Sequence, residues 1–359
     1  MAERKFLIIS IFVTLGAIAF LSGYLLMPEK VSNQTGSLIK RFNISEVSVS
    51  NTPKTLPLSS RKFVSFVAPG SERIIAVDKN GDIVEINTAN LTEKTATNLT
   101  NYTGQTSVVE AVLSPTGNSI IYSFYDSGNN KKHVYLNFIK NESANIDANL
   151  KSAVFSSDGS QYAYLVSGSK ASGSGEGELL ISNGVNIVKR ALKTRISAAV
   201  VAWPSDFISI TSYDKDGYGD LFILKSDGAL NKILSYQYDL NVRWSPSGEK
   251  VIFSAKSNNG HDQLFYLGVK NSGTVVNLDI STGASKCVWA DEESVVCGLT
   301  TEVQFKDEFY KINVGDGSRV IVATPSTNLL TKELVLNHSG DTLFVLNDID
   351  SKLYAFKIK

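Results

Sequence analysis

A hairpin signature that returns at regular intervals constrains this chain more than any other feature. Its best copy lies at 242–253, where an apolar strand, a Ser-Pro-Ser-Gly turn and a strand of β-branched and aromatic residues follow one another. Each copy is anchored on the bulky residue that ends its first strand, and the anchors are Val67, Leu113, Phe155, Trp203, Trp244, Trp289 and Leu336. Successive anchors lie 41 to 48 residues apart. This period, with several strands in each unit, is typical of propeller blades.

The turn after each anchor explains why the copies are expected to fold alike. Pro presets one turn dihedral, Ser and Asp hydrogen-bond the local backbone, and Gly accepts a positive φ. Related turns are Ser-Pro-Thr-Gly at 114–117, Ser-Ser-Asp-Gly at 156–159 and Asn-His-Ser-Gly at 337–340. Two copies depart from the pattern, because 203–206 is short and lacks Gly, and 289–293 lacks both Pro and Gly.

A second and a third strand can be placed after every turn, and a weaker fourth strand before most of the following anchors. The first strands are apolar on both faces, which indicates packing between neighbouring sheets. We therefore predict an all-β fold, a β-propeller over residues 61–359 with seven four-stranded blades. Six blades, with one copy misread, is the alternative, and a long β-sandwich would not explain the period. The last copy ends at its third strand, so we expect a strand near 44–49 to close the ring.

The N-terminal segment has the character of a membrane anchor. Residues 6–27 contain no charge, and about 20 apolar residues cross a bilayer as a helix. The run is longer than the apolar region of a cleaved signal peptide, so we predict an uncleaved transmembrane signal anchor, with cleavage as the alternative. Arg4 and Lys5 precede it and favour a cytoplasmic tip at 1–5. A polar stalk at 28–60 would then lead to a propeller on the extracytoplasmic side of this single-pass membrane protein.

The repeat unit also points to a known family. Its anchor, Ser-Pro-x-Gly turn, Ile/Val-rich strand and Asp-Leu-Phe type strand are clearest at 240–267, 111–136 and 216–222. Over about 63–357 the pattern resembles the TolB-type, WD-like β-propeller repeat. The resemblance implies a propeller fold and a general habit of protein binding. TolB itself has six blades and a preceding α/β domain, which this chain does not match, so membership of the Tol-Pal system is not implied.

Charge and motifs argue against several functions. The 35 basic and 35 acidic residues cancel, so the chain lacks the electrostatic signature of a general nucleic-acid binder. There is no Gly-x-Ser-x-Gly nucleophile motif, so a propeller-plus-hydrolase peptidase is not indicated. His133, His261 and His338 share no motif and are expected at the surface. We therefore expect no cofactor and no enzymatic activity.

The expected binding face is the one that carries the long loops. Loops between second and third strands share a face with the loops that lead into the first strands, and long loops on a rigid scaffold usually carry binding. The residues that lead into the first strands and line the expected channel mouth include Glu110, Lys151, Asn241, Lys286 and Glu333. Arg243 interrupts the apolar pattern of the first strands and is expected to line the channel or to donate between blades. A merely solvated rim is the alternative. The short turns on the opposite face are expected to be scaffold.

Two smaller features admit more than one interpretation. Asp214, Asp216 and Asp220 surround two glycines loosely as in a calcium loop, but the bidentate Glu of such loops is missing. An ordinary turn is expected there, with a metal site as the weak alternative. Cys287 and Cys297 flank the centre of a predicted hairpin, in a register that would place them opposite each other. A disulfide and two buried free thiols both remain open.

The leading hypothesis from the sequence is a membrane-anchored, extracytoplasmic scaffold module that binds a protein or envelope partner. An enzyme, a hydrolase or lyase that uses the central channel, is the alternative. It would predict three or more carboxylates or histidines that converge in the channel. A structural subunit of a larger envelope assembly is the third possibility.

Overall fold

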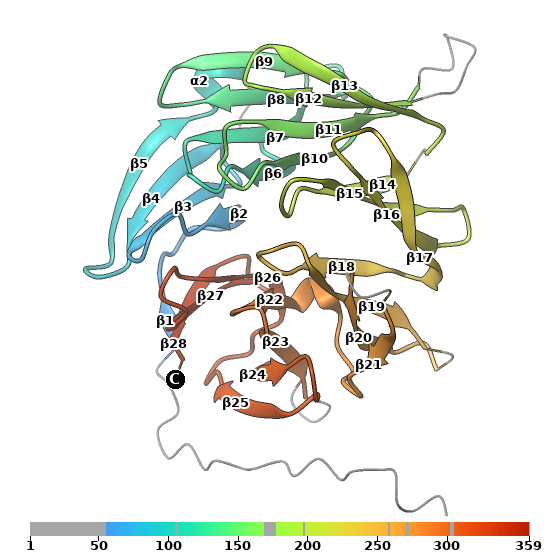
Figure 1. Ribbon diagram of the computed structural model, residues 1–359. Helices are drawn as coiled ribbons and strands as arrows, with labels where there is room; N and C mark the ends of the chain where they lie inside the picture. Colours follow the sequence, from blue (N-terminus) through green and yellow to red (C-terminus); the bar gives the residue numbers. More distant parts are fainter. Residues whose placement is uncertain are drawn as a thin grey trace, which may run out of the picture. The chain divides into compact units, whose positions relative to one another are not determined.

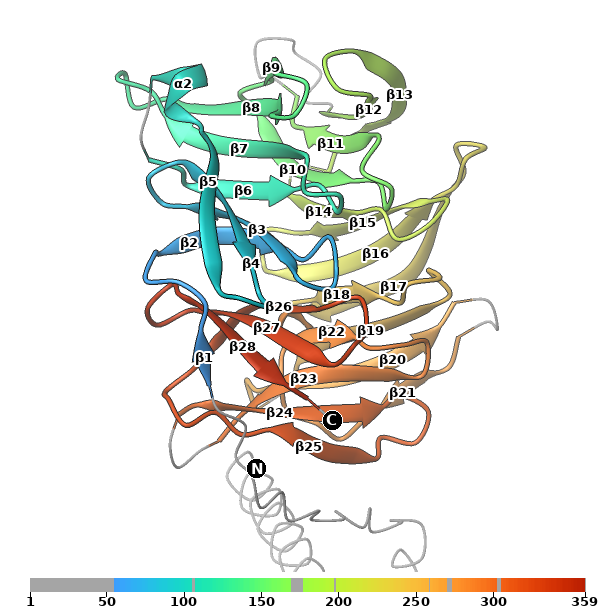
Figure 2. The same cartoon turned by 90° about the vertical axis from the view of Figure 1, so that its left-hand side faces the viewer.

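The computed structural model describes residues 55–104, 107–168, 177–196, 198–257, 259–269, 273–301 and 305–358. In these ranges seven antiparallel sheets of four strands follow one another around a ring (Figure 1). Figure 2 shows the same sheets from the side, with β2–β5 and β26–β28 as the first and last of the chain. The seven-bladed propeller is thereby confirmed, and the six-bladed alternative and the sandwich are excluded.

The strands are given from the innermost to the outermost of each sheet. The first two sheets contain β2 (Phe63–Val67), β3 (Arg73–Asp78), β4 (Asp82–Asn87), β5 (Thr92–Asn98), and β6 (Glu110–Leu113), β7 (Ser119–Tyr125), β8 (Lys131–Asn137), β9 (Glu142–Ile146). The third and fourth contain β10 (Leu150–Phe155), β11 (Tyr162–Val166), β12 (Gly177–Ser182), β13 (Ile187–Thr194), and β14 (Ala199–Ala202), β15 (Ile208–Tyr213), β16 (Tyr218–Leu224), β17 (Leu230–Tyr238). The fifth and sixth contain β18 (Asn241–Trp244), β19 (Lys250–Lys256), β20 (Asp262–Gly268), β21 (Val275–Asn277), and β22 (Cys287–Trp289), β23 (Ser294–Thr300), β24 (Asp307–Asn313), β25 (Arg319–Ala323). The seventh contains β26 (Thr331–Leu336), β27 (Thr342–Asn347), β28 (Leu353–Lys357) and β1 (Leu56–Pro57).

The ring is closed by the N-terminal side of the described chain. Strand β1 pairs antiparallel with β28, with Leu56 opposite Ala355 and Pro57 opposite Tyr354. The seventh sheet therefore gains its fourth strand from the start of the propeller, which leaves no unpaired third strand at the junction. The closing strand was predicted near 44–49, a segment that lies outside the described residues. The strand that pairs with β28 in the structure is β1.

The turns after the first strands have the geometry that their sequences predict. Gly117, Gly159, Gly248 and Gly340 have φ values of 68°, 70°, 74° and 69°, in the left-handed region that glycine adopts without steric cost. In each turn the glycine N–H donates to the carbonyl three residues earlier, at 2.8 to 3.0 Å. These repeated turns reverse the chain at the same face of every such blade.

Apolar side chains fill the spaces between neighbouring sheets. Phe66 of the first sheet shares a buried cluster with Phe344 of the seventh, and Leu221 of the fourth with Phe253 of the fifth. Each of the seven clusters found among the described residues joins one pair of neighbouring sheets. The core therefore runs around the ring, and every sheet is packed against a neighbour on both faces. Full burial of a large apolar side chain contributes about 1.5–3 kcal/mol to the stability of these contacts.

Two short helical segments interrupt the strands, α2 (Thr100–Thr103) and the 3-10 helix η2 (Ala284–Lys286). Within the described ranges no helix has the length and apolarity needed to cross a membrane. The predicted anchor at 6–27 lies outside these ranges and stays a prediction.

Candidate functional site

Arg243 lies on β18, the innermost strand of the fifth sheet. Solvent reaches its side chain, yet the surrounding protein is dense enough that desolvation lowers the pKa of the guanidinium. This combination is expected for a side chain in the channel at the centre of the ring. Its Nη2 donates a long hydrogen bond of 3.4 Å to the carbonyl oxygen of Ser285, and no ion pair within 4 Å joins it to another described residue. Several guanidinium donors are therefore free to bind a ligand.

Glu333 is the acidic counterpart of Arg243 and lies on β26, the innermost strand of the seventh sheet. Desolvation raises the pKa of its carboxyl to about 7. The positive charges of Arg243 and Lys332, and hydrogen bonds from the Ser65 hydroxyl and the Phe66 N–H, act in the opposite direction and lower it. Glu333 is thus an acid that titrates near neutral pH, close enough to Arg243 for the two charges to interact.

The helix η2 connects these two groups. It leads into the sixth sheet and contacts both β18 and β26. Its Ser285 carbonyl accepts the hydrogen bond from Arg243, while Lys286 Nζ donates to Asp307 Oδ1 at 3.0 Å and to Thr300 Oγ1 at 2.9 Å. Asp307 is fully buried. Lys286 therefore neutralises a buried carboxylate and holds η2 against the sixth sheet, which positions the helix beside Arg243.

The other residues expected at the channel mouth are dispersed. Glu110 forms an ion pair with Lys131 Nζ at 2.7 Å on the second sheet. Asn241 donates from Nδ2 to the Asp239 carbonyl at 3.2 Å, at the start of β18. Lys151 is exposed on β10, with no ion pair to another described residue. Of the six residues singled out in the sequence, the structure brings together Arg243, Lys286 and Glu333.

The acidic loop uses its carboxylates locally. Asp214 Oδ1 accepts from the N–H groups of Asp216 and Tyr218, both at 2.9 Å, and so closes its own turn. Asp220 accepts from Lys232 Nζ at 2.6 Å and from the Tyr236 N–H at 2.8 Å. Across the described ranges no three His, Cys, Asp or Glu side chains are grouped so that they could hold a metal ion.

Cys287 and Cys297 form a disulfide with an S–S distance of 2.07 Å. They lie directly opposite each other on β22 and β23. Cys287 follows η2 directly in the chain, so the bond also fixes the end of the helix that contacts Arg243.

His133 differs from the sequence-based expectation. It was expected at the surface, but its side chain is only 3% exposed and its Nδ1 lies 2.8 Å from Ser123 Oγ. Burial lowers the pKa of the imidazole. The residue lies on β8, a third strand that is covered by neighbouring sheets on both faces. Its place within a third strand of a predicted blade was the sequence signal that could have predicted its burial.

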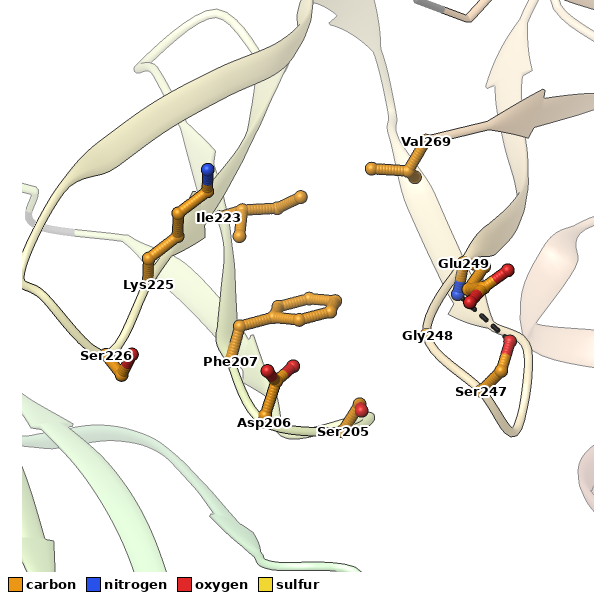
Figure 3. Close-up of a pocket in the computed structure, with 10 residues that line it drawn as sticks. All are labelled: Ser205, Asp206, Phe207, Ile223, Lys225, Ser226, Ser247, Gly248, Glu249 and Val269. Carbon is orange, nitrogen blue, oxygen red and sulfur yellow. Dashed lines mark hydrogen bonds between the residues drawn. The ribbon is translucent and has the colours of Figure 1, made fainter. Parts of the chain in front are cut away.

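A cavity of about 740 Å³ opens on the opposite face, between turns of the fourth and fifth sheets (Figure 3). It is lined by Ser205, Asp206, Phe207, Ile223, Lys225, Ser226, Ser247, Gly248, Glu249 and Val269. Its volume suits a small ligand. The sequence predicts that these turns are only scaffold, so it does not predict the cavity. Its charged side chains, Asp206, Lys225 and Glu249, are exposed to solvent.

Comparisons with known proteins support the fold. No family model and no curated protein matches the chain. Among solved structures, an oligogalacturonate lyase in complex with manganese matches with a TM-score of 0.63 and 9% identity, over 86% of this chain and 94% of the lyase. The RRP9 WD40 repeats match with a TM-score of 0.57 and 10% identity, over 86% and 99%. An acylaminoacyl peptidase from Pyrococcus horikoshii matches with a TM-score of 0.56 and 12% identity, over 80% of this chain and 49% of the peptidase.

At such low identity these matches establish the fold class, a seven-bladed β-propeller with WD40-like blades. The chain spans about half the length of the peptidase that it matches. The expectation that the chain is not an enzyme is wrong, because propellers of this shape include a lyase and a peptidase as well as WD40 repeats. The missing catalytic motif was therefore no argument against activity. The TolB-type resemblance and the membrane anchor gain no support from these comparisons.

Proposed function

We propose that this propeller binds an anionic ligand, one that presents a carboxylate, at the mouth of its central channel through Arg243. The observation that carries the proposal is an exposed guanidinium on an innermost strand that forms no ion pair with another described residue, close to a glutamate with a pKa of about 7. An Arg guanidinium binds carboxylates through two parallel hydrogen bonds, and a partly desolvated site strengthens them.

The local charge balance supports an anion rather than a cation. Glu333 has a pKa of about 7, so at neutral pH it neutralises only part of the charge on Arg243. Lys332 adds a further positive charge near the same carboxyl. Lys286 contributes little, since Asp307 already neutralises it. The site therefore attracts negative charge, and more strongly as the pH falls below 7.

A second candidate function is catalysis on such a ligand. A carboxyl group with a pKa of about 7 is suited to general acid–base catalysis at neutral pH, and Glu333 lies beside the cation that would bind the substrate. A hydrolase or lyase reaction in the channel is consistent with the enzymes among the similar folds. Oligogalacturonate, named for one of them, is an acidic saccharide and supplies a first probe.

The location and the partner follow from the sequence prediction. We propose that residues 6–27 anchor the chain in a membrane and that the propeller lies on the extracytoplasmic side. An acidic saccharide of the envelope, or a protein segment with an exposed carboxylate, would then reach the face that carries the long loops.

Isothermal titration of the full chain with trigalacturonate, and separately with an N-acetylated dipeptide that keeps its C-terminal carboxylate, tests the proposal. We expect saturable binding of at least one probe and a loss of tenfold or more in Arg243→Gln. The matched control is Arg73→Gln, because Arg73 pairs with Glu85 at 2.7 Å on strands away from the channel. If neither probe binds, or if Arg243→Gln binds as tightly as the wild type, the proposal is wrong. Mass spectrometry of the saccharide after incubation, with Glu333→Gln as the control, tests catalysis.

A further inference from the structure

We propose a second ligand site on the fourth blade, a platform of Tyr218, Tyr236 and Tyr238 that binds the ring of a neutral saccharide. The three tyrosines lie where β16 begins and β17 ends, beside the 214–218 loop. This loop joins the second to the third strand, so the platform lies on the same face as the channel mouth. It does not depend on the function proposed for Arg243.

The three aromatic rings form an exposed cluster that contains one parallel pair. The rings of Tyr218 and Tyr236 are stacked, with centroids 4.0 Å apart and an angle of 6° between their planes. Tyr238 lies 5.3 Å from Tyr218 and is tilted by 52°. Tyr236 is 69% exposed and Tyr238 46% exposed. Aromatic side chains usually bury most of their area, so a stacked cluster left in solvent marks a surface that binds something.

The backbone holds Tyr236 outward at a steric cost. Its φ is +56°, a conformation that is uncommon for a bulky residue. The register between β16 and β17 shifts at this point, and the Tyr236 N–H donates to Asp220 Oδ1 at 2.8 Å. Asp220 is in turn held by Lys232 at 2.6 Å. Backbone strain of this kind is concentrated at ligand sites, where the surrounding structure maintains it.

The polar groups beside the rings favour a neutral ligand. A cavity of about 220 Å³ adjoins the stack and is lined by Arg195, Ile196, Ser212, Tyr213, Asp214, Tyr218, Asp220 and Tyr236. It offers donors and acceptors, and both signs of charge are present, because Arg195 lines it with the two carboxylates and Lys232 pairs with Asp220. A pyranose ring has an apolar C–H face for the tyrosines and hydroxyl groups at its edge for this cavity. A free cation would gain less, since basic side chains already accompany the carboxylates.

Saturation-transfer NMR with the full chain tests this site, in a detergent without a sugar headgroup where one is needed. The probes are maltotriose, cellotriose, xylotriose and chitotriose. We expect transfer to the ring C–H protons of at least one trisaccharide, and a loss of affinity of tenfold or more in Tyr236→Gly, which removes the ring but tolerates the positive φ. Tyr238→Ala should weaken binding to a smaller extent.

The matched control is Tyr125→Ala, because Tyr125 is a similarly exposed tyrosine, 48%, that is stacked on no described ring. Tyr125→Ala and Arg243→Gln should both bind the trisaccharide like the wild type, which separates this site from the channel. The inference is overturned if no trisaccharide binds, if Tyr236→Gly binds unchanged, or if lysine ethyl ester binds at the tyrosines in place of the sugars.

Discussion

Arg243 and Glu333 lie on the innermost strands of the fifth and seventh sheets, and each stabilises the charged form of the other. Desolvation lowers the pKa of Arg243 and raises that of Glu333, and their mutual attraction opposes both shifts. The sixth sheet, which lies between theirs in the ring, contributes η2 with the Ser285 carbonyl. The site is thus built from three consecutive blades.

Glu333 should make the stability of the fold depend on pH. Its folded-state pKa of about 7 exceeds the ordinary value of 4.5, so the folded chain binds the proton more tightly than the unfolded chain. The resulting stabilisation is complete below pH 4.5 and is lost as the pH rises through 7. Relative to Glu333→Gln, the wild type should lose about 2 kcal/mol between pH 5 and 8, a value reduced for solvent screening. Urea unfolding at both pH values measures this difference, and a constant difference would contradict the account.

The ion pair between Lys286 and Asp307, which holds η2, should contribute far more to the stability of the fold than surface ion pairs do. Asp307 is fully buried and accepts from Lys286 Nζ, from Thr300 Oγ1 and from the Thr331 N–H at 2.7 Å. Asp307→Ala removes the acceptor that these donors share and leaves the charge of Lys286 without its counter-ion, so we expect a loss of about 3–5 kcal/mol.

The control for Asp307 is Glu85→Ala, which breaks the partly exposed pair with Arg73 and should cost at most about 1 kcal/mol. Denaturant unfolding of both variants gives the comparison. Equal losses of stability in the two variants would show that the buried ion pair of Asp307 is no more stabilising than the exposed pair.

Two glycines in equivalent turns separate backbone strain from packing. Gly248 and Gly340 have φ values of 74° and 69°. A Cβ on Gly340 would meet no atom within 4 Å, whereas one on Gly248 would lie 3.0 Å from both Phe207 and Ser205, which also line the 740 Å³ cavity. Gly340→Ala should cost about 1–2 kcal/mol from its backbone conformation alone.

Gly248→Ala should cost a further 1–3 kcal/mol or so, because the added methyl group overpacks the contact between two blades. Thermal and urea unfolding of the two variants provide the measurement. A Gly248→Ala variant no less stable than Gly340→Ala would show that the two turns are not packed as described.

The disulfide should stabilise the sixth blade. Cys287 and Cys297 are separated by 10 residues, and closing a loop of this size contributes roughly 2–3 kcal/mol. Reduction with dithiothreitol should lower the melting temperature of the wild type and leave a Cys287→Ala, Cys297→Ala double variant unchanged. If reduction does not affect the wild type, the disulfide contributes nothing to stability.

Much of the fold could be predicted from local sequence. Six of the seven anchors end an innermost strand, and Trp203 comes directly after β14, because the apolar strand and the turn chemistry act within about ten residues. The closing strand could not be placed in this way. Strand β1 is the Leu-Pro dipeptide at 56–57, too short to show alternation.

The candidate site was less predictable, since its properties arise between segments distant in sequence. Arg243 could be identified from the sequence because it interrupts an apolar pattern. Its proximity to Glu333 could not, because it depends on how three blades are arranged. The structural role of Lys286 depends on Asp307, and the cavity in Figure 3 depends on how the turns at 205–207 and 247–249 face each other. The tyrosine platform was equally hidden, because a register shift in β17 brings Tyr236 over Tyr218.

The most direct test of the central claim is the affinity for trigalacturonate as a function of pH. Carboxylates of the probe stay ionised above about pH 5, so only the charge of the site changes between pH 6 and 8. As Glu333 ionises through its pKa of about 7, it should compete for Arg243. The wild type should then lose affinity about threefold to tenfold, as expected for charges in a partly hydrated site. Glu333→Gln should keep the higher affinity throughout. Equal wild-type affinity at both pH values, or full affinity in Arg243→Gln, would contradict the account.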